Sequence, residues 1–197
     1  MVTRSSSIST SDSGRRTLVN KRSARCDIGV AIIRPYHTND ASTLVQIAGA
    51  FAVAQWMSED FAHPYTLTDA ESWIAETQRH DPLQAWAVEV EGKLAGGVGL
   101  EPLVGSHAGG AILGYWLGID YWGRGIATAV VHQIVMDGFA TGLRRIEAHV
   151  FEQNVASARV LEKAGFRLEA RLEKSYIERD GKPCDKLIYA RLEVSDA

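Results

Sequence analysis

The segment from residue 109 to residue 142 limits the possible folds more than any other part of the chain. It opens with GGAILGYWLGI (109–119), which predicts a strand that is apolar on both faces. A turn with two glycines follows, and then a helix whose apolar positions recur every three or four residues as far as Phe139. A strand that is apolar on both faces lies inside a sheet that is covered on both sides. The segment therefore predicts an α/β protein with this strand near the centre of its sheet.

The other segments can be read as strands and helices in a definite order. Strands are predicted at 28–35, 85–91, 94–103, 144–151, 166–177 and 184–194, with a closing hairpin made by the last two. Helices are predicted from Asp40, as the cap, to Phe51, from a capping box of Thr68 and Glu71, and from 157 to Gly165. The order β-α-α-β-β-β-α-β-α-β-β indicates an α/β (α+β) domain with a mixed sheet of about seven strands and helices on both faces.

The charge of the chain divides into two parts. Residues 1–26 contain six Lys or Arg and one Asp, for +5, so the net −3 of the chain leaves −8 on residues 27–197. The first part is rich in serine and poor in large apolar residues, which predicts a disordered tail outside a single domain at 27–197. A dispensable tail and a transit-peptide-like targeting segment are both compatible with this composition.

Several classes of protein are excluded or disfavoured. The chain has no apolar run of the ~18–20 residues that span a bilayer, so no membrane association is expected. Its two cysteines, Cys26 and Cys184, form neither a disulfide framework nor a zinc-site spacing, so we expect a reducing, cytoplasmic location and no metal. The acidic body gives no reason to expect a nucleic-acid partner.

The turn YWGRGIAT (121–128) is the segment most indicative of function. It joins the buried strand to the start of an amphipathic helix, where free backbone N–H groups and the helix dipole favour an anion. Gly123 and Gly125 let the backbone approach a phosphate closely, and Ala127 keeps the first helical turn small. Arg124 could add a charge-assisted contact. The turn therefore predicts a phosphate-binding loop.

The turn is also compatible with other interpretations. A bare Gly-x-Gly is often only a strand–helix connection. A dinucleotide site needs a third glycine where this chain has Thr128, although Glu147 lies at a suitable distance for the ribose acid, and it needs alternating strands and helices upstream. A P-loop is excluded because no Gly-Lys-Ser/Thr follows.

Taken together, the motifs resemble those of the GCN5-related N-acetyltransferases (GNAT superfamily). More narrowly, the chain is similar to the branch that contains bacterial ribosomal-protein N-terminal acetyltransferases. The resemblance covers most of residues 28–194 and is carried by Ile33-Arg34-Pro35, Asp40-Ala41, Pro64-Tyr65-Thr66, Trp73-Ile74, Gly114-Tyr115-Trp116, Trp122-Gly123-x-Gly125-x-Ala127-Thr128, Arg145-Ile146, Asn154-x-x-Ser157, Val160-Leu161-Glu162-Lys163-x-Gly165-Phe166, Asp185 and Tyr189. Most of the superfamily has Gln or Arg at the position of Trp122, whereas the narrower branch commonly has Trp.

The resemblance implies a mostly antiparallel sheet and a site for acetyl-CoA as co-substrate. The strand at 109–119 would splay from its parallel neighbour at 144–151, and the pantetheine arm would enter between them. A strand amide near Leu117 would donate to the thioester carbonyl, and Asn154 would contact the arm; by itself Asn154 also suits a helix N-cap. The implied cofactor-binding residues are Leu117, Ile119, Trp122, Gly123, Arg124, Gly125, Ile126, Ala127, Thr128 and Asn154.

The implied reaction is acetyl transfer to a primary amine, which benefits from a general acid and a general base. Ser157 is the candidate acid, and Glu101 is a candidate base, with His149 or Glu152 acting through water as other options. Some members carry a Glu in the closing hairpin where this chain has Ser175 or Tyr176, so that role does not transfer. Each candidate base could equally be a surface residue, and an amine that arrives partly neutral needs none.

The acceptor is expected to be a peptide N-terminus or a small-molecule amine, which the charge of −8 on the body suits. A groove at 40–80 could hold it, lined by aromatic residues that could equally be core: Phe51, Trp56, Met57, Phe61, His63 and Tyr65. The rival function is a non-catalytic acyl-CoA-binding or regulatory module on the same fold. A monomer or a homodimer would fit either function.

Overall fold

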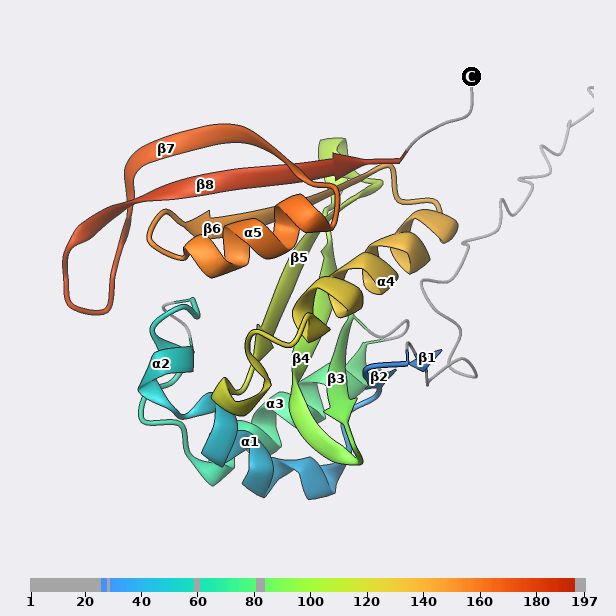
Figure 1. The fold of residues 1–197 in the computed structure, drawn as a ribbon, viewed down its shortest axis with the longest axis vertical. Coiled ribbons are helices and arrows are strands. Elements are labelled where there is room, and N and C mark those ends of the chain that lie inside the picture. The colour runs from blue at the N-terminus through green and yellow to red at the C-terminus, as the bar shows by residue number, and fades with distance from the viewer. Residues whose placement is uncertain (1–25, 28, 59–60, 81–83, 194–197) are drawn as a thin grey trace, which may run out of the picture.

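The computed structural model describes residues 26–27, 29–58, 61–80 and 84–193 (Figure 1). The predicted tail therefore lies outside the described residues except for Cys26, whose backbone belongs to the first strand. The elements are β1 (Cys26–Asp27), β2 (Ile32–Arg34), α1 (Ala41–Ala48), α2 (Phe51–Ala54), α3 (Leu67–Arg79), β3 (Ala85–Val90), β4 (Lys93–Pro102), β5 (Gly110–Leu117), α4 (Ile126–Ala140), β6 (Arg145–Phe151), α5 (Val155–Lys163), β7 (Arg167–Ile177) and β8 (Pro183–Leu192).

The strands form one sheet in the order β1-β2-β3-β4-β5-β6-β8-β7, and only β5 and β6 are parallel. The predicted mixed, mostly antiparallel sheet is confirmed, with the two-residue β1 added to the seven strands expected. The first predicted strand, 28–35, was too long: β2 covers only Ile32–Arg34. The chain turns before it at Gly29, whose φ of +79° lies in the left-handed region and cannot continue a strand.

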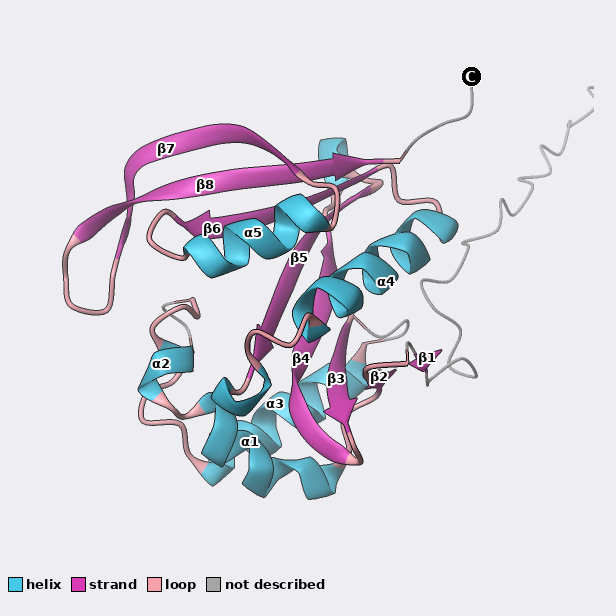
Figure 2. Ribbon diagram, viewed as in Figure 1, coloured by secondary structure: helices cyan, strands magenta, loops and turns pink. Residues whose placement is uncertain are grey.

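Helices cover both faces of the sheet, as expected (Figure 2). On one face α4 and α5 pack against the main core, to which α4 contributes Val130, Val131, Ile134 and Val135. On the other face α1 and α3 enclose a smaller core that includes Leu44 and Ile74. We call these the α4–α5 face and the α1–α3 face.

Two predicted helix caps are replaced by other arrangements. Asp40 precedes α1 but makes no side-chain cap; its carboxylate instead accepts hydrogen bonds from the buried Arg34 at 2.7 and 2.9 Å. The capping box of α3 is Thr66 with Asp69, not Thr68 with Glu71, because the extended backbone at Thr66 starts the helix two residues earlier.

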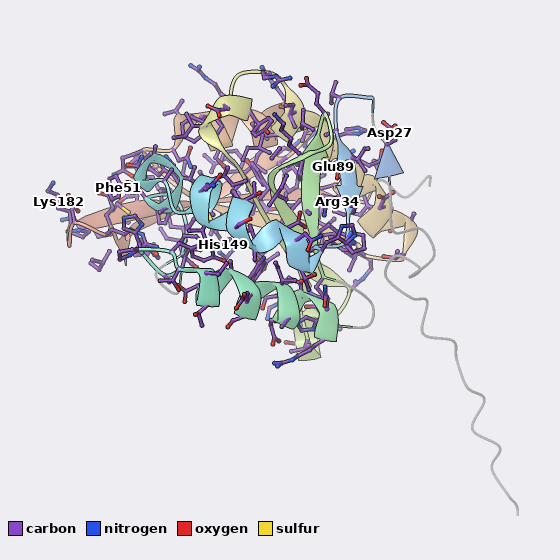
Figure 3. The ribbon with its side chains drawn as sticks, turned by 90° about the horizontal axis from the view of Figure 1, so that it is seen from below. Asp27, Arg34, Phe51, Glu89, His149 and Lys182 are labelled. Carbon is purple, nitrogen blue, oxygen red and sulfur yellow. The ribbon has the colours of Figure 1, made fainter. Side chains whose placement is uncertain are left out.

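Arg34 joins the start of α1 to the sheet. Its Nε donates to Oε2 of Glu89 on β3 at 2.6 Å, while its two Nη atoms hold Asp40 (Figure 3). Burial alone would raise the pKa of Asp40, but hydrogen bonds from Arg34 and from the backbone of His37 outweigh it and hold the pKa below its ordinary value.

The helix predicted to run from 40 to 51 is divided. It ends at Ala48, and α2 begins at Phe51 after Ala50 adopts an extended backbone. Glycine ends two helices as predicted: Gly142 follows α4 with φ +97°, and Gly165 follows α5 with φ +85°. After α5 the N–H of Phe166 donates to the carbonyl of Leu161 at 3.0 Å, which completes the expected Schellman motif.

None of the helices in the described part of the chain combines the length and the apolar character needed to cross a membrane.

Candidate active site

The parallel pairing of β5 with β6 is short. It joins Gly110 to Arg145, Ala111 to Ile146 and Ile112 to Glu147, and then stops. On its other edge β5 stays paired with β4 as far as Leu117, so β5 continues while β6 turns away (Figure 1). We call the stretch where residues 113–117 and 148–151 are no longer paired the wedge.

Backbone donors line the β5 side of the wedge. The N–H of Gly118 donates to the carbonyl of Ala95 at 2.8 Å, so it faces β4. Successive N–H groups of a strand alternate between its two edges, which directs those of Tyr115 and Leu117 into the wedge. The Nε1 of Trp122 donates to the carbonyl of Leu117 at 2.8 Å and fixes the loop against the end of β5.

The predicted phosphate loop lies at the open end of the wedge. Gly123 and Gly125 have φ of +71° and +77°, and a Cβ at either would meet nothing within 4 Å. The space beside them is therefore open, and their left-handed backbone is one that other residues adopt at a cost of about 1–2 kcal/mol.

Helix α4 begins immediately after this loop without a side-chain cap. Its first internal bond runs from the N–H of Ala129 to the carbonyl of Gly125, so the N–H groups of Ile126, Ala127 and Thr128 have no acceptor within the helix. Together with the helix dipole, these donors form a cradle for an anion.

The Arg124 side chain turns away from this cradle. It makes an exposed ion pair with Glu91 at 3.2 Å and lies 5.8 Å from the centre of the Tyr121 ring. Ile119 and Trp122 are about half exposed beside it. Next to the cradle, an open depression of about 530 Å³ runs along α4 toward the end of α5, lined by Gly125, Thr128, Ala129, His132, Gln133 and Lys163.

Ser157 lies across the wedge from β5. Its Oγ is 2.8 Å from the hydroxyl oxygen of Tyr115, and that hydroxyl is also 3.1 Å from the Ser157 carbonyl. Burial raises the pKa of Tyr115 to about 12, partly offset by the Ser157 hydrogen bond, so the phenol keeps its proton near neutral pH. Asn154 caps α5, because its Oδ1 accepts from the Ser157 N–H at 3.1 Å, which leaves its amide nitrogen for other contacts.

The candidate base Glu101 lies on β4, exposed, with Ile112 of β5 as its neighbour. Ile112 in turn pairs with Glu147, so the two carboxylates flank the last paired position before the wedge on the α1–α3 face. None of the contacts found among the described residues joins Glu101 to Ser157. The structure places Glu101 at the closed end of the wedge and Ser157 on its α4–α5 side.

The aromatic residues expected to line a groove at 40–80 separate into groups. The rings of Phe61 and Tyr65 stack at 4.7 Å, and Tyr65 packs against the smaller core. Trp56 instead faces the end of β6, 6.4 Å from the Phe151 ring, and Phe151 lies 4.5 Å from Tyr176 of the closing hairpin. These last three form an aromatic wall beside the wedge.

An arginine at the tip of the closing hairpin holds that wall together. Arg179 donates to the carbonyl oxygens of Ala54, Ser58 and Phe61, at 2.9, 3.1 and 2.6 Å. Sequence reasoning missed this residue, since nothing near it in the sequence indicates a partner more than 100 positions away. It also missed the pairing of Tyr115 with Ser157, for which the Gly114-Tyr115-Trp116 motif was the available signal.

Within the part of the chain that the structure describes, no group of three or more His, Cys, Asp or Glu residues is placed to hold a metal ion.

Comparison with known proteins finds relatives of this chain. The family described as "Acetyltransferase (GNAT) domain" matches residues 31–167. The uncharacterized N-acetyltransferase YoaA of Bacillus subtilis (strain 168) is 37% identical over 108 residues, which cover 53% of this chain and 60% of that protein. A probable N-acetyltransferase of the same organism, YjcK, is 39% identical over 84 residues, 42% of this chain and 46% of that protein. The matching regions thus span about half the length of these curated relatives.

Solved structures resemble the fold over more of its length. Mycobacterium smegmatis RimJ in complex with CoA-disulfide has a TM-score of 0.73 and 28% identity, covering 84% of this chain and 83% of that one. The microcin C7 self-immunity acetyltransferase MccE, in complex with acetyl-CoA and AMP, has a TM-score of 0.75 and 21% identity, with 87% and 97% covered. At that identity the second likeness concerns the fold alone.

Proposed function

Because the chain belongs to the acetyltransferase (GNAT) family, we propose that it transfers an acetyl group from acetyl-CoA to a primary amine. One observation carries the proposal: the β5–β6 ladder ends at Ile112–Glu147, and the glycine loop and uncapped start of α4 follow at the open end. A cofactor with a phosphate group and an extended, strand-like arm fits this combination.

Each part of the cofactor has a matching group. The pyrophosphate would accept hydrogen bonds from the N–H groups at the start of α4. The pantetheine arm would pair with the β5 edge, and the N–H of Tyr115 or Leu117 would donate to the thioester oxygen as it gains charge. The depression that Lys163 and His132 line would take the nucleotide end. The family resemblance and the CoA-disulfide complex of Mycobacterium smegmatis RimJ support this placement.

The Tyr115–Ser157 pair lies where the departing sulfur would form. Attack of a neutral amine on the thioester carbonyl makes the C–N bond, and collapse of the intermediate breaks the C–S bond and releases the thiolate. When the neutral Tyr115 hydroxyl donates to Oγ of Ser157, 2.8 Å away, the Ser157 hydroxyl proton is available to the sulfur. We therefore assign Ser157 as the acid and Tyr115 as the residue that orients it.

The acceptor amine would arrive from the α1–α3 face, beside the aromatic wall of Trp56, Phe151 and Tyr176. A peptide N-terminus or a small-molecule amine fits this route. We place the enzyme in the cytoplasm, as a monomer or a homodimer, on the sequence grounds given above.

Calorimetric titration with coenzyme A and thiol detection with acetyl-CoA and a panel of amines test the proposal. We expect coenzyme A to bind and at least one amine to release free thiol. Binding without thiol release from any amine would favour the non-catalytic acyl-CoA module, and no binding at millimolar ligand would refute both functions.

A further inference from the structure

His149 lies on the α1–α3 face of β6, just beyond the residues of β6 that pair with β5. Its neighbours on β6, Ala148 and Val150, belong to the core of the α4–α5 face, so strand alternation directs His149 to the other side (Figure 3). It follows Glu147, the last paired residue of β6, by two positions. Its side chain is 33% exposed, which leaves it accessible to a small molecule at the surface.

The position opposite His149 on β5 has no side chain. Gly114 stands two residues beyond Ile112, as His149 stands two beyond Glu147, and a Cβ on Gly114 would meet nothing within 4 Å. A pantetheine arm that enters the wedge cannot extend past Ile112, because β5 and β6 are paired with each other from that residue onward. Its reactive end must therefore stop close to Gly114, where the missing side chain leaves the carbonyl open to an amine from the α1–α3 face.

One nitrogen of the His149 ring lies beside a carboxylate of the same strand. Its Nε2 lies 3.3 Å from Oε1 of Glu147. An ionised carboxylate only accepts hydrogen bonds, so Nε2 carries the hydrogen and Nδ1 keeps its lone pair free.

Glu147 is in turn part of a charged row on the same strand. Arg145 donates to its other oxygen, Oε2, at 3.0 Å, and also to Glu169 of β7 at 2.6 and 3.0 Å. Two carboxylates thus share one guanidinium, and these three side chains carry a net charge of −1 beside the ring. Other charged residues on this face include Glu101 of β4, Arg167 of β7 and Lys186 of β8, whose ammonium lies 4.9 Å from the centre of the Tyr176 ring.

The geometry points to His149 as the proton acceptor for the incoming amine, with Glu147 as its positioning residue; this inference rests on the proposed acetyl transfer. Nδ1 takes one proton from the ammonium, and the neutral amine then attacks the thioester. As the amide forms, the amine gives its second proton to water; Ser157 gives its proton to the thiolate and regains one from water, and the imidazole later releases its proton to water. Histidine is the side chain most often used as a general base, and His149 lies beside the wedge, whereas Glu101 lies at its closed end.

Steady-state rates of His149→Gln test the assignment, with wild-type activity first established in the amine panel. We expect kcat/KM for the amine to fall about 100-fold at pH 7, with coenzyme A binding unchanged. Glu147→Gln should fall less and shift the acidic limb of the pH–rate profile. Imidazole added to the buffer should restore part of the rate of His149→Ala. His107→Gln, at an exposed position outside the sheet, is the matched control and should keep the wild-type rate.

An unchanged rate and pH profile in His149→Gln would overturn the assignment, as would a comparable loss in Glu101→Gln alone. Nitrogen NMR of the ring adds a test that needs no activity: the neutral ring should carry its hydrogen on Nε2, and a hydrogen on Nδ1 contradicts the proposed geometry. A wild-type protein that binds coenzyme A but acetylates no amine would count against the proposed function, and the NMR result would still judge the geometry.

Discussion

The two sides of the candidate site are built in different ways. The donor side comprises residues 117–128, one continuous stretch from the end of β5 to the first turn of α4. The acceptor side combines α2, the end of β6 and the tip of the β7–β8 hairpin, joined by contacts such as Arg179 to Ala54 across 125 positions. The donor side is thus fixed by local backbone geometry, and the acceptor side by a few tertiary contacts.

This difference suggests which side can vary. A change on the donor side alters the backbone that would hold the cofactor. A change on the acceptor side alters the aromatic wall, which the Arg179 side chain holds in place. The predictions below test that division, beginning with the largest effect.

Gly125→Val should nearly abolish coenzyme A binding. The branched side chain strains a φ of +77° and fills the open space beside the N–H groups of α4. Loss of two charge-assisted hydrogen bonds predicts a decrease in affinity on the order of 100-fold, measured by calorimetry. Gly142→Val is the matched control, because Gly142 has φ +97° and open space at the other end of the same helix. Equal loss of affinity in both variants would contradict a phosphate site at Gly125.

Arg179→Met should affect the acceptor side alone. Without its three hydrogen bonds the wall beside the wedge loosens, and we expect the KM for the amine to rise about tenfold while the KM for acetyl-CoA stays unchanged. Lys182→Met, at the exposed tip of the same hairpin, is the control and should match the wild type (Figure 3). A rise in both KM values would mean that the two sides are coupled.

Ser157→Ala should lower kcat by roughly tenfold at pH 7, because a thiolate is a good leaving group and needs only modest help from an acid. Coenzyme A affinity, measured in parallel, should stay within about twofold, since the capping bond to Asn154 uses the backbone N–H. A kcat equal to that of the wild type would remove the acid assignment and leave the donor side intact.

Tyr115→Phe should change the alkaline limb of the stability curve. The raised pKa of Tyr115 means that the folded state holds this proton more tightly than the unfolded state does. The contribution of Tyr115 to the free energy of unfolding is therefore constant below pH 10 and declines from about pH 10 to 12. The variant should lack about 1 kcal/mol of the loss between pH 10 and 11, measured by urea unfolding. Tyr65, whose pKa burial also raises to about 12, is present in both proteins, so its titration affects both stability curves equally.

The sequence predicts the donor side of the site better than the acceptor side. The glycine turn between β5 and α4, the glycine stops at Gly142 and Gly165 and the order of the elements along the chain were predictable, because each depends on residues close together in the chain. Asp40 was predicted to cap the following helix, yet its carboxylate is bound by Arg34 and by the preceding backbone N–H of His37, and the sequence did not indicate the Arg34 contact.

The contacts that were not predictable all depend on where distant segments meet. Arg179 resembles any polar turn residue until the hairpin tip lies over α2, and His149 resembles a surface residue until the ladder is seen to end beside it. Glu101 is predicted near the end of its strand, and the register with β5 and β6 adds that it lies at the closed end of the wedge. Side-chain chemistry was thus readable from the sequence, whereas the partners of those side chains were not.

The short β5–β6 ladder has a consequence for how long the protein survives. In the part of the chain that the structure describes, the β5–β6 ladder pairs three residues of each strand, so an occupant of the wedge would add the missing strand. A ligand that binds only the folded state at 100 times its Kd stabilises it by about 2.7 kcal/mol. In a cell rich in acetyl-CoA the protein should therefore resist proteolysis, and when that pool is depleted it should be degraded faster, which would couple its abundance to carbon supply.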